Sequence, residues 1–172
     1  MKDIIVVCFY GPESTGKTTS ARRLAALYQT EYVPEVAREF IQSNIFSEDD
    51  IVKIGEEQVK RTLEKLETAN RILFCDTDLI TTQIYAQHYL GVVPPILYEL
   101  EKKIQFDHYF LFDIDVLWLA DGLRDLGHKR EEMLSVFKIA LESRGLPYTW
   151  VRGSYDERES IILRKLIEPQ SI

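Results

Sequence analysis

The sequence lacks the features that mark membrane-spanning and disulfide-stabilised proteins. No apolar run in its 172 residues approaches the roughly 20 residues that cross a bilayer. Its two cysteines, Cys8 and Cys75, lie inside apolar stretches that predict core strands. Buried free thiols are therefore favoured over a disulfide or a metal site. The first apolar strand begins near Ile4, which leaves no room for a signal peptide. We expect a cytoplasmic protein that inserts in no membrane.

Basic residues and histidines are also scarce. The chain has 21 Lys and Arg against 28 Asp and Glu, a formal net charge of −7, which argues against nucleic acid as the main partner. The three histidines are dispersed, with no ligand spacing. No internal repeat, low-complexity tract or linker divides the sequence, so we expect one domain over residues 1–172. The aromatic content suits either a core or an interface, which leaves the oligomeric state open.

The most informative segment that is present reads GPESTGKT, from Gly11 to Thr18. It matches the phosphate loop, in which glycines let consecutive backbone N–H groups curl around phosphate oxygens. Lys17 supplies an ammonium for the terminal phosphates, and the Thr18 hydroxyl can ligate Mg²⁺. The loop joins an apolar strand over 4–9 to a helix over 17–28, so the alternative of a glycine turn without ligand is disfavoured. The expected ATP-binding residues here are Gly11, Glu13, Ser14, Thr15, Gly16, Lys17, Thr18 and Thr19.

Hydrophobic patterning predicts strands that alternate with helices along the whole chain. Further strands are expected over 31–33, 71–75, 108–112 and 147–151. Helices are expected over 35–42, 47–69, 79–89, 96–104, 130–144 and 154–167. This alternation predicts a three-layer α/β domain with a parallel sheet. Ligands of such sheets bind at the carboxyl ends of the strands, which is where the polar candidates fall.

Asp76 and Asp78 end the predicted strand over 71–75. A carboxylate there can hold Mg²⁺ next to the phosphate loop. Alternating spacing also allows one of the two to face the metal while the other caps the following helix, and both could be caps. The sequence leaves these alternatives open.

Glu35 and Arg38 share one face of the helix predicted over 35–42, because they are three residues apart. A carboxylate there can accept the proton of an acceptor hydroxyl, and the arginine can hold substrate or phosphate. The alternative is a solvated ion pair with no role in binding.

The segment from Trp118 to Arg124 combines an aromatic residue, glycine and arginine, which is unusual for a core element. Arginine-bearing lids close over triphosphates and neutralise transition-state charge. Trp118 can stack on a planar ring, or it can plug the core. We expect a small lid at about residues 115–130, with Arg124 and Arg130 as further ATP contacts.

Several stretches, read in order, resemble the ribosylnicotinamide kinase domain of NadR-type proteins. They are GPESTGKTT, PEVAREF, the glutamine of GEEQ, FCDTDLITTQ, and WLADGLRDLG with the downstream Tyr155-Asp156-Glu157-Arg158. They keep the family's order and spacing and cover nearly the whole chain. PEVAREF, CDTDLITTQ and DGLR are more specific than the phosphate loop, because phosphate-loop kinases in general lack them.

The resemblance implies transfer of the ATP γ-phosphoryl group to the 5′-hydroxyl of ribosylnicotinamide, with Mg²⁺, giving nicotinamide mononucleotide. It implies the fold of nucleoside kinases, a five-stranded parallel sheet in the order 2-3-1-4-5 with a small lid. The catalytic candidates that it strengthens are Lys17, Glu35, Asp76, Asp78 and Arg124. The candidate substrate contacts are Glu35, Arg38, Asp78, Trp118 and Asp121, and the candidate metal ligands are Thr18 and Asp76.

Three points stay open at this stage. Whether Glu35 or a strand-end aspartate is the base is undecided, and loose phosphoryl transfer needs little base strength. A kinase for another nucleoside or small metabolite, or an ATP-binding sensor module, remains an alternative. Full-length NadR-type proteins also carry an adenylyltransferase domain, and some a helix-turn-helix domain. This sequence begins at the kinase strand and ends with the last helix, so we expect neither of those activities.

Overall fold

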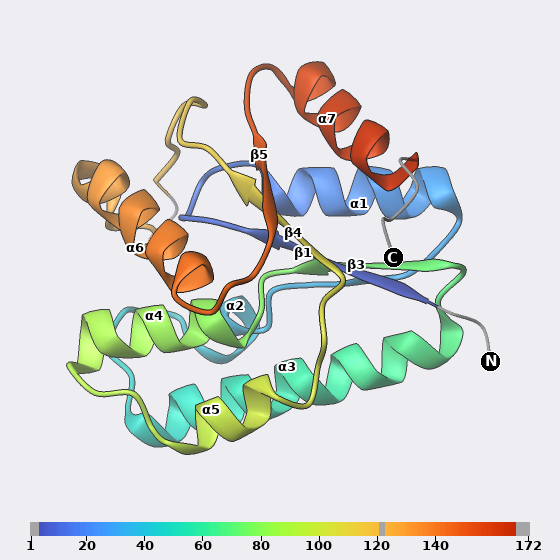
Figure 1. The fold of residues 1–172 in the computed structure, drawn as a ribbon. Helices are drawn as coiled ribbons and strands as arrows, with labels where there is room; N and C mark the ends of the chain where they lie inside the picture. Colours follow the sequence, from blue (N-terminus) through green and yellow to red (C-terminus); the bar gives the residue numbers. More distant parts are fainter. Residues whose placement is uncertain (1–3, 121–122, 168–172) are drawn as a thin grey trace.

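A computed structural model describes residues 4–120 and 123–167 of the chain. Five parallel strands form one sheet in the order β2-β3-β1-β4-β5, as predicted (Figure 1). The strands are β1 (Ile5–Tyr10), β2 (Tyr32–Val33), β3 (Ile72–Asp76), β4 (His108–Phe112) and β5 (Tyr148–Val151). Parallel neighbours require crossover connections, and each crossover here contains helix.

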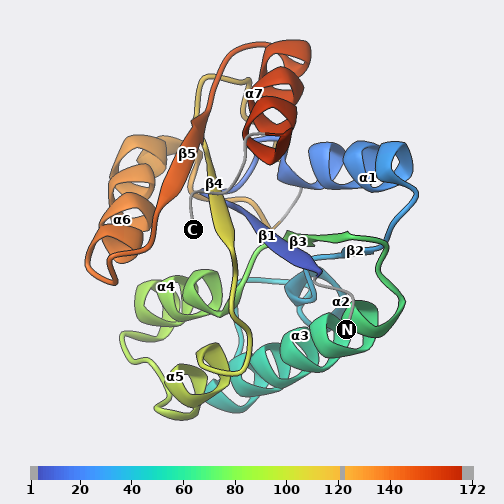
Figure 2. The same cartoon turned by 45° about the vertical axis from the view of Figure 1, so that its right-hand side comes forward.

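Helices cover both faces of this sheet. They are α1 (Lys17–Tyr28), α2 (Ala37–Phe40), α3 (Glu48–Thr68), α4 (Leu79–Leu90), α5 (Ile96–Glu101), α6 (Arg130–Glu142) and α7 (Tyr155–Ile167), with a 3₁₀ turn, η1, at Gly127–Lys129. α1 and α7 lie together on one side, and α3, α4 and α5 lie on the other (Figure 1). Figure 2 shows α6 beside α4. None of the helices in the described part of the chain is long and apolar enough to cross a membrane.

The central strand β1 is apolar on both faces because helices cover both. Val7 and Phe9 point into a core that α1 and α7 complete. Cys8 and Tyr10 point the opposite way, into a core shared with α4 and α6. Period-two alternation within a continuous apolar run therefore builds two cores from one strand. This arrangement holds the loop after Tyr10 between two packed layers.

The predicted elements are confirmed to within two residues at their ends, apart from the helix expected over 96–104. The helix expected over 35–42 is shortened at both ends to α2, because Ile41 adopts an extended backbone. The helix expected to reach residue 104 ends at Glu101. Leu63, which shares the apolar spacing of α3, is 45% exposed. The helix instead buries Gln58 and Thr62, so its inner face is more polar than hydrophobic spacing predicts.

Phe9 anchors the core between the sheet and α1, because its ring contacts three other aromatic rings. The centroids of Phe74, Phe110 and Phe112 lie 5.2–5.7 Å from its own. Phe9→Ala is expected to lower the free energy of unfolding by about 3–5 kcal/mol, the usual loss for a buried ring. Urea unfolding measures it, with exposed Leu27→Ala as the control that should stay within about 0.5 kcal/mol. A similar small loss for both variants would contradict this account of the core.

Candidate functional site

The loop between β1 and α1 depends on two glycines. Gly11 has φ 136° and Gly16 has φ 88°, backbone angles that residues other than glycine rarely adopt. A Cβ on Gly11 would lie 2.8 Å from the carbonyl oxygen of Phe112. The loop then enters α1 at Lys17, so the positive end of that helix points at the loop interior. Loop amides and helix end together form a cradle for an anion.

Lys17 is buried at the centre of this cradle. Its Nζ donates to the carbonyl oxygens of Gly11, at 2.9 Å, and Pro12, at 2.6 Å. Burial lowers the pKa of Lys17, while the nearby charges of Asp76 and Glu35 oppose that shift. The ammonium is thus held beside the loop by neutral carbonyls, which a phosphate oxygen can replace.

Asp76 lies beneath the loop at the end of β3, and its Oδ2 accepts a hydrogen bond from the Thr18 hydroxyl. Its Oδ1 is buried and has no hydrogen-bond partner among the described residues. Burial, together with the charge of Glu35, raises the pKa of Asp76 to about 6. A hydroxyl and a carboxylate with a spare oxygen are the hard ligands that Mg²⁺ prefers, and Mg²⁺ on nucleotides needs only one or two of them. The pair therefore fits the metal site that the sequence predicts.

Asp78 occupies a different environment, although it is only two residues away. Its Oδ1 accepts from the backbone N–H of Thr81 at 2.9 Å, which makes it the N-cap of α4. Its Oδ2 accepts from the Tyr109 hydroxyl at 3.0 Å. Both oxygens are thus used within the protein, whereas Asp76 keeps one oxygen without a partner among the described residues. Neither aspartate is part of the lining of the main cavity, but Asp76 contacts Thr18, which does line it. Asp78 is therefore a helix cap, and Asp76 is the candidate metal ligand of the two.

A cavity of about 240 Å³ opens directly from the phosphate loop. Its loop end is lined by Gly11, Glu13, Ser14, Thr15, Gly16, Lys17, Thr18 and Thr19. Its other end reaches α2, α3, α4 and the segments before α2 and α3, whose cavity-lining residues include Glu35, Arg38, Phe46, Ile51, Ile54, Tyr85 and Tyr89. All eight predicted loop contacts therefore face one space, together with Glu35, Arg38 and Arg124.

Glu13, one of these loop residues, has a shifted pKa. Burial and the charge of Asp125 raise the pKa of Glu13 to about 7.

Glu35 and Arg38 form the ion pair that their spacing predicts. The Arg38 Nε lies 3.2 Å from Glu35 Oε2, and both side chains are partly exposed. The pair lines the cavity, so it is both a solvated ion pair and part of the candidate site. Glu39 on the same helix instead pairs with Arg61 of α3, which fixes α2 against its neighbour.

The described residues between β4 and η1 form no helix or strand, and they cross the cavity. The backbone N–H of Leu119 donates to the Ser14 hydroxyl at 2.9 Å, on the phosphate-loop side. Asn44 donates to the Leu123 carbonyl at 3.0 Å, on the side of α2 and α3. Arg124 lines the cavity, and its Nη1 donates to the Leu119 carbonyl at 3.2 Å. This segment thus touches both ends of the cavity, as a lid would.

Two predicted contacts in or near this segment, Trp118 and Arg130, lie outside the cavity lining. Trp118 does not line the cavity, and its ring packs so closely on Gly127 that a Cβ there would lie 2.8 Å from it. Arg130 also lies outside the lining, and it donates to the carbonyls of Val116, at 2.8 Å, and Ser14, at 3.4 Å. Asp121 falls outside the described residues. The roles of these three residues stay predictions.

Sequence reasoning did not single out the wall opposite the phosphate loop. Phe46, from the segment before α3, and Tyr85 and Tyr89, both on α4, gather there, with Phe46 and Tyr89 centroids 5.6 Å apart. Tyr155 was noted only within a motif, yet it lines the cavity beside Gly16. Aromatic spacing along α4 was the available signal, and it does not distinguish a cavity wall from a core.

Comparisons with known proteins agree with this geometry. Residues 6–158 match the AAA domain family. The trifunctional NAD biosynthesis/regulator protein NadR of Escherichia coli (strain K12) is 31% identical, over 88% of this chain and 39% of that protein. The corresponding protein of Salmonella typhimurium is 29% identical over the same shares. The chain therefore spans about two fifths of the length of these relatives.

Solved structures show the same likeness in three dimensions. A NadR protein crystallised in complex with NR superposes with a TM-score of 0.82 at 25% identity, over 99% of this chain and 54% of that one. A deoxyadenosine kinase from M. mycoides superposes with a TM-score of 0.68 at 12% identity, over 94% and 98% of the two chains, which shows the fold alone. The resemblance to NadR and the phosphate-loop kinase fold are both confirmed. With its family match over most of its length, the chain belongs to the AAA domain family.

Proposed function

We propose that this protein transfers the γ-phosphoryl group of ATP to the 5′-hydroxyl of ribosylnicotinamide and so makes nicotinamide mononucleotide for NAD synthesis. One observation carries the proposal: a single cavity joins the phosphate loop to a carboxylate and an aromatic wall. Phosphoryl transfer needs a donor and an acceptor in one water-poor space. The similarity to NadR, including a NadR crystallised with NR, supports the choice of acceptor.

The donor half follows from the loop. Its backbone N–H groups and the N-terminus of α1 bind the phosphates, and Lys17 moves from the loop carbonyls to the terminal phosphates. Thr18 and Asp76 would hold Mg²⁺, which would supply neutralisation of the phosphate charge. Arg124, already at the cavity from the lid side, adds positive charge near the transferred group. Lys17, Thr18 and Arg124 line this space, and Asp76 lies behind Thr18, to which it is hydrogen-bonded.

The acceptor half follows from α2, α3 and α4. Glu35 orients the 5′-hydroxyl and accepts its proton, because Asp76 faces the metal site and Asp78 is used as a cap. Phe46, Tyr85 and Tyr89 offer ring surfaces to a planar base, and such apolar walls with few polar groups are typical of ligand pockets. A reaction that consumes ATP also suits the cytoplasm, which we propose as its location.

The proposal predicts a strong preference among nucleosides. With ATP and Mg²⁺, kcat/KM for ribosylnicotinamide should exceed that for adenosine, cytidine and thymidine by at least about a hundredfold. The reason is that contacts between the nucleoside and the acceptor half of the cavity stabilise the transition state more for the fitting nucleoside than for the others. Mass spectrometry of the mononucleotide measures product, and a titration with an ATP analogue checks that the protein binds nucleotide. Preference for another nucleoside would indicate the alternative kinase. Nucleotide binding without transfer to any acceptor would indicate a sensor module.

A further inference from the structure

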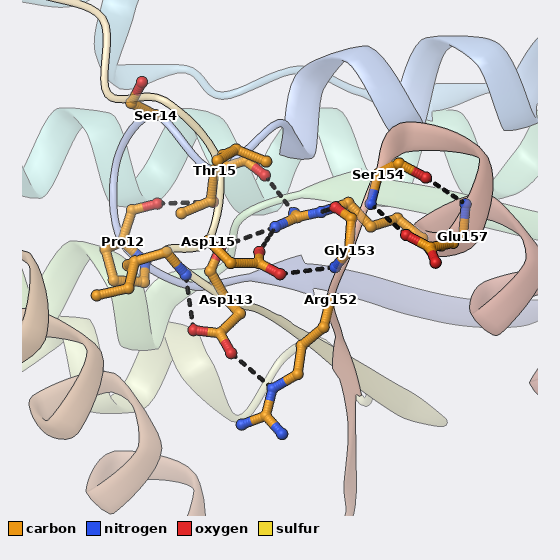
Figure 3. Close-up of polar contacts among 12 residues, drawn as sticks. Pro12, Ser14, Thr15, Asp113, Asp115, Arg152, Gly153, Ser154 and Glu157 are labelled. Carbon is orange, nitrogen blue, oxygen red and sulfur yellow. Dashed lines mark hydrogen bonds and ion pairs between the residues drawn. The ribbon is translucent and has the colours of Figure 1, made fainter.

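Arg158 in α7 is a fully buried arginine next to the phosphate loop, with a relative exposure of 0%. Its guanidinium reaches three separate segments. Nη1 donates to the Thr15 carbonyl at 2.7 Å, and Nε donates to the Gly153 carbonyl at 2.8 Å. Nη2 donates to the Asp113 carbonyl at 3.1 Å and pairs with the carboxylate of Asp115. Figure 3 labels the partners on all three segments, namely Thr15, Gly153, Asp113 and Asp115. Arg158 therefore ties the loop to the ends of β4 and β5.

The bond to Thr15 has a geometric consequence for anion binding. In a trans peptide the carbonyl and the following N–H point in opposite directions. A guanidinium that holds the Thr15 carbonyl from outside the loop therefore turns the Gly16 N–H toward the loop interior. That interior is the cavity where the phosphates are proposed to bind, and Gly16 lines it.

A purely structural link would not require a buried cation. Burying a charge is costly, and an apolar side chain of similar volume is often as stabilising. The ring of Phe112 lies 5.7 Å from the guanidinium carbon, so the surroundings already include an apolar surface. What an apolar residue lacks is the planar fork of donors that reaches carbonyls on three segments at fixed angles. The arginine thus supplies orientation that packing alone would not.

We propose that Arg158 is a positioning residue for the phosphate loop, which sets the Thr15–Gly16 peptide so that its N–H faces the bound triphosphate. It acts through the loop and does not line the cavity itself. The inference rests on the proposed function only in that the loop binds a nucleoside triphosphate. The identity of the acceptor does not enter it.

The test compares Arg158→Lys and Arg158→Met with Arg152→Met. Arg152 is the control, because it pairs with the Asp113 side chain at 2.6 Å and stacks on Trp150, both outside the phosphate loop (Figure 3). Calorimetry measures the Kd of Mg²⁺ with a non-hydrolysable ATP analogue, and steady-state kinetics measure KM for each substrate. Both Arg158 variants should bind the analogue at least about tenfold more weakly, since each breaks a charge-assisted hydrogen bond. KM for ATP should rise, KM for the acceptor should stay within about twofold, and the control should match wild type.

Two further readouts separate positioning from mere stabilisation. In ¹H–¹⁵N spectra of the free proteins, Arg158→Lys should shift the Gly16 amide resonance while resonances of the sheet stay in place. If Arg158→Met does not fold, Arg158→Lys carries the test alone. A folded Arg158→Lys protein with wild-type affinity for the analogue and an unshifted Gly16 amide would overturn the inference. Analogue binding is measured without acceptor, so failure to phosphorylate ribosylnicotinamide would overturn the proposed function but not this role.

Discussion

Lys17→Ala is expected to lower kcat by about 10²–10³-fold, the usual loss when one fixed group that stabilises transition-state charge is removed. Lys17 sits at the centre of the loop, with its ammonium held by the carbonyls of Gly11 and Pro12. When a triphosphate binds, this charge is proposed to serve the transferring group. Stability should change little, because burial already disfavours the charged form of Lys17 and lowers its pKa.

The measurement is kcat with saturating ATP and acceptor, accompanied by a thermal melt. Lys60→Ala is the control, since Lys60 lies on the surface of α3 with its side chain 63% exposed. That variant should keep wild-type turnover. Turnover of Lys17→Ala within threefold of wild type would refute the assignment of the loop as the donor site.

Asp76→Asn is expected to lower kcat by at least about a hundredfold, because the carboxylate is proposed to hold the metal that neutralises phosphate charge. Its neighbour provides a matched comparison. Asp78 is equally buried, yet both of its oxygens accept hydrogen bonds, from Thr81 and Tyr109, whereas Asp76 Oδ1 has no partner among the described residues. Asparagine caps a helix about as well as aspartate, so Asp78→Asn should change stability little and leave kcat within a few-fold of wild type. A larger loss of kcat in Asp78→Asn than in Asp76→Asn would reverse the two roles.

The same Asp76 variant should be more stable than wild type at pH 8 without magnesium. Burial raises the pKa of Asp76 to about 6, against an ordinary value of 3.8. Because the folded protein holds this proton more tightly than the unfolded chain does, the protonated carboxyl favours folding. Its contribution to the free energy of unfolding is complete below pH 3.8 and is lost as the pH rises through about 6. Asparagine stays neutral, so Tm should rise by about 2–4 °C at pH 8. The gain should shrink toward pH 5. A lower Tm for Asp76→Asn at pH 8 would contradict this reading.

The parts of the site that were predictable from the sequence are those with local causes. The glycine spacing of the phosphate loop, the apolar run of β1 and the helix after Lys17 each depend on neighbouring residues. Strand-end polar residues could also be assigned to one edge of the sheet, because parallel topology brings carboxyl ends together. The convergence of Glu35 with the loop follows from that second rule, whereas the order of the strands was expected only from the resemblance to NadR-type kinases.

The parts that were not predictable depend on contacts between distant segments. The environments of Asp76 and Asp78 differ because Thr18, on α1, donates to Asp76, whereas Tyr109, on β4, donates to Asp78. The aromatic wall forms only when the segment before α3 meets α4, as the contact of Phe46 with Tyr89 shows. Trp118 illustrates the same limit. Its residue type suited ring stacking, but its position is set by packing on Gly127.

A crystal structure with ribosylnicotinamide and a non-hydrolysable ATP analogue tests the central claim most directly, namely that one cavity holds donor and acceptor together. The account predicts the triphosphate on the loop from Gly11 to Thr18 and the pyridine ring against Phe46, Tyr85 and Tyr89. It predicts the 5′-hydroxyl between Glu35 and the γ-phosphate. A nucleoside bound outside this cavity, or one whose 5′-hydroxyl points away from the phosphate loop, would contradict it.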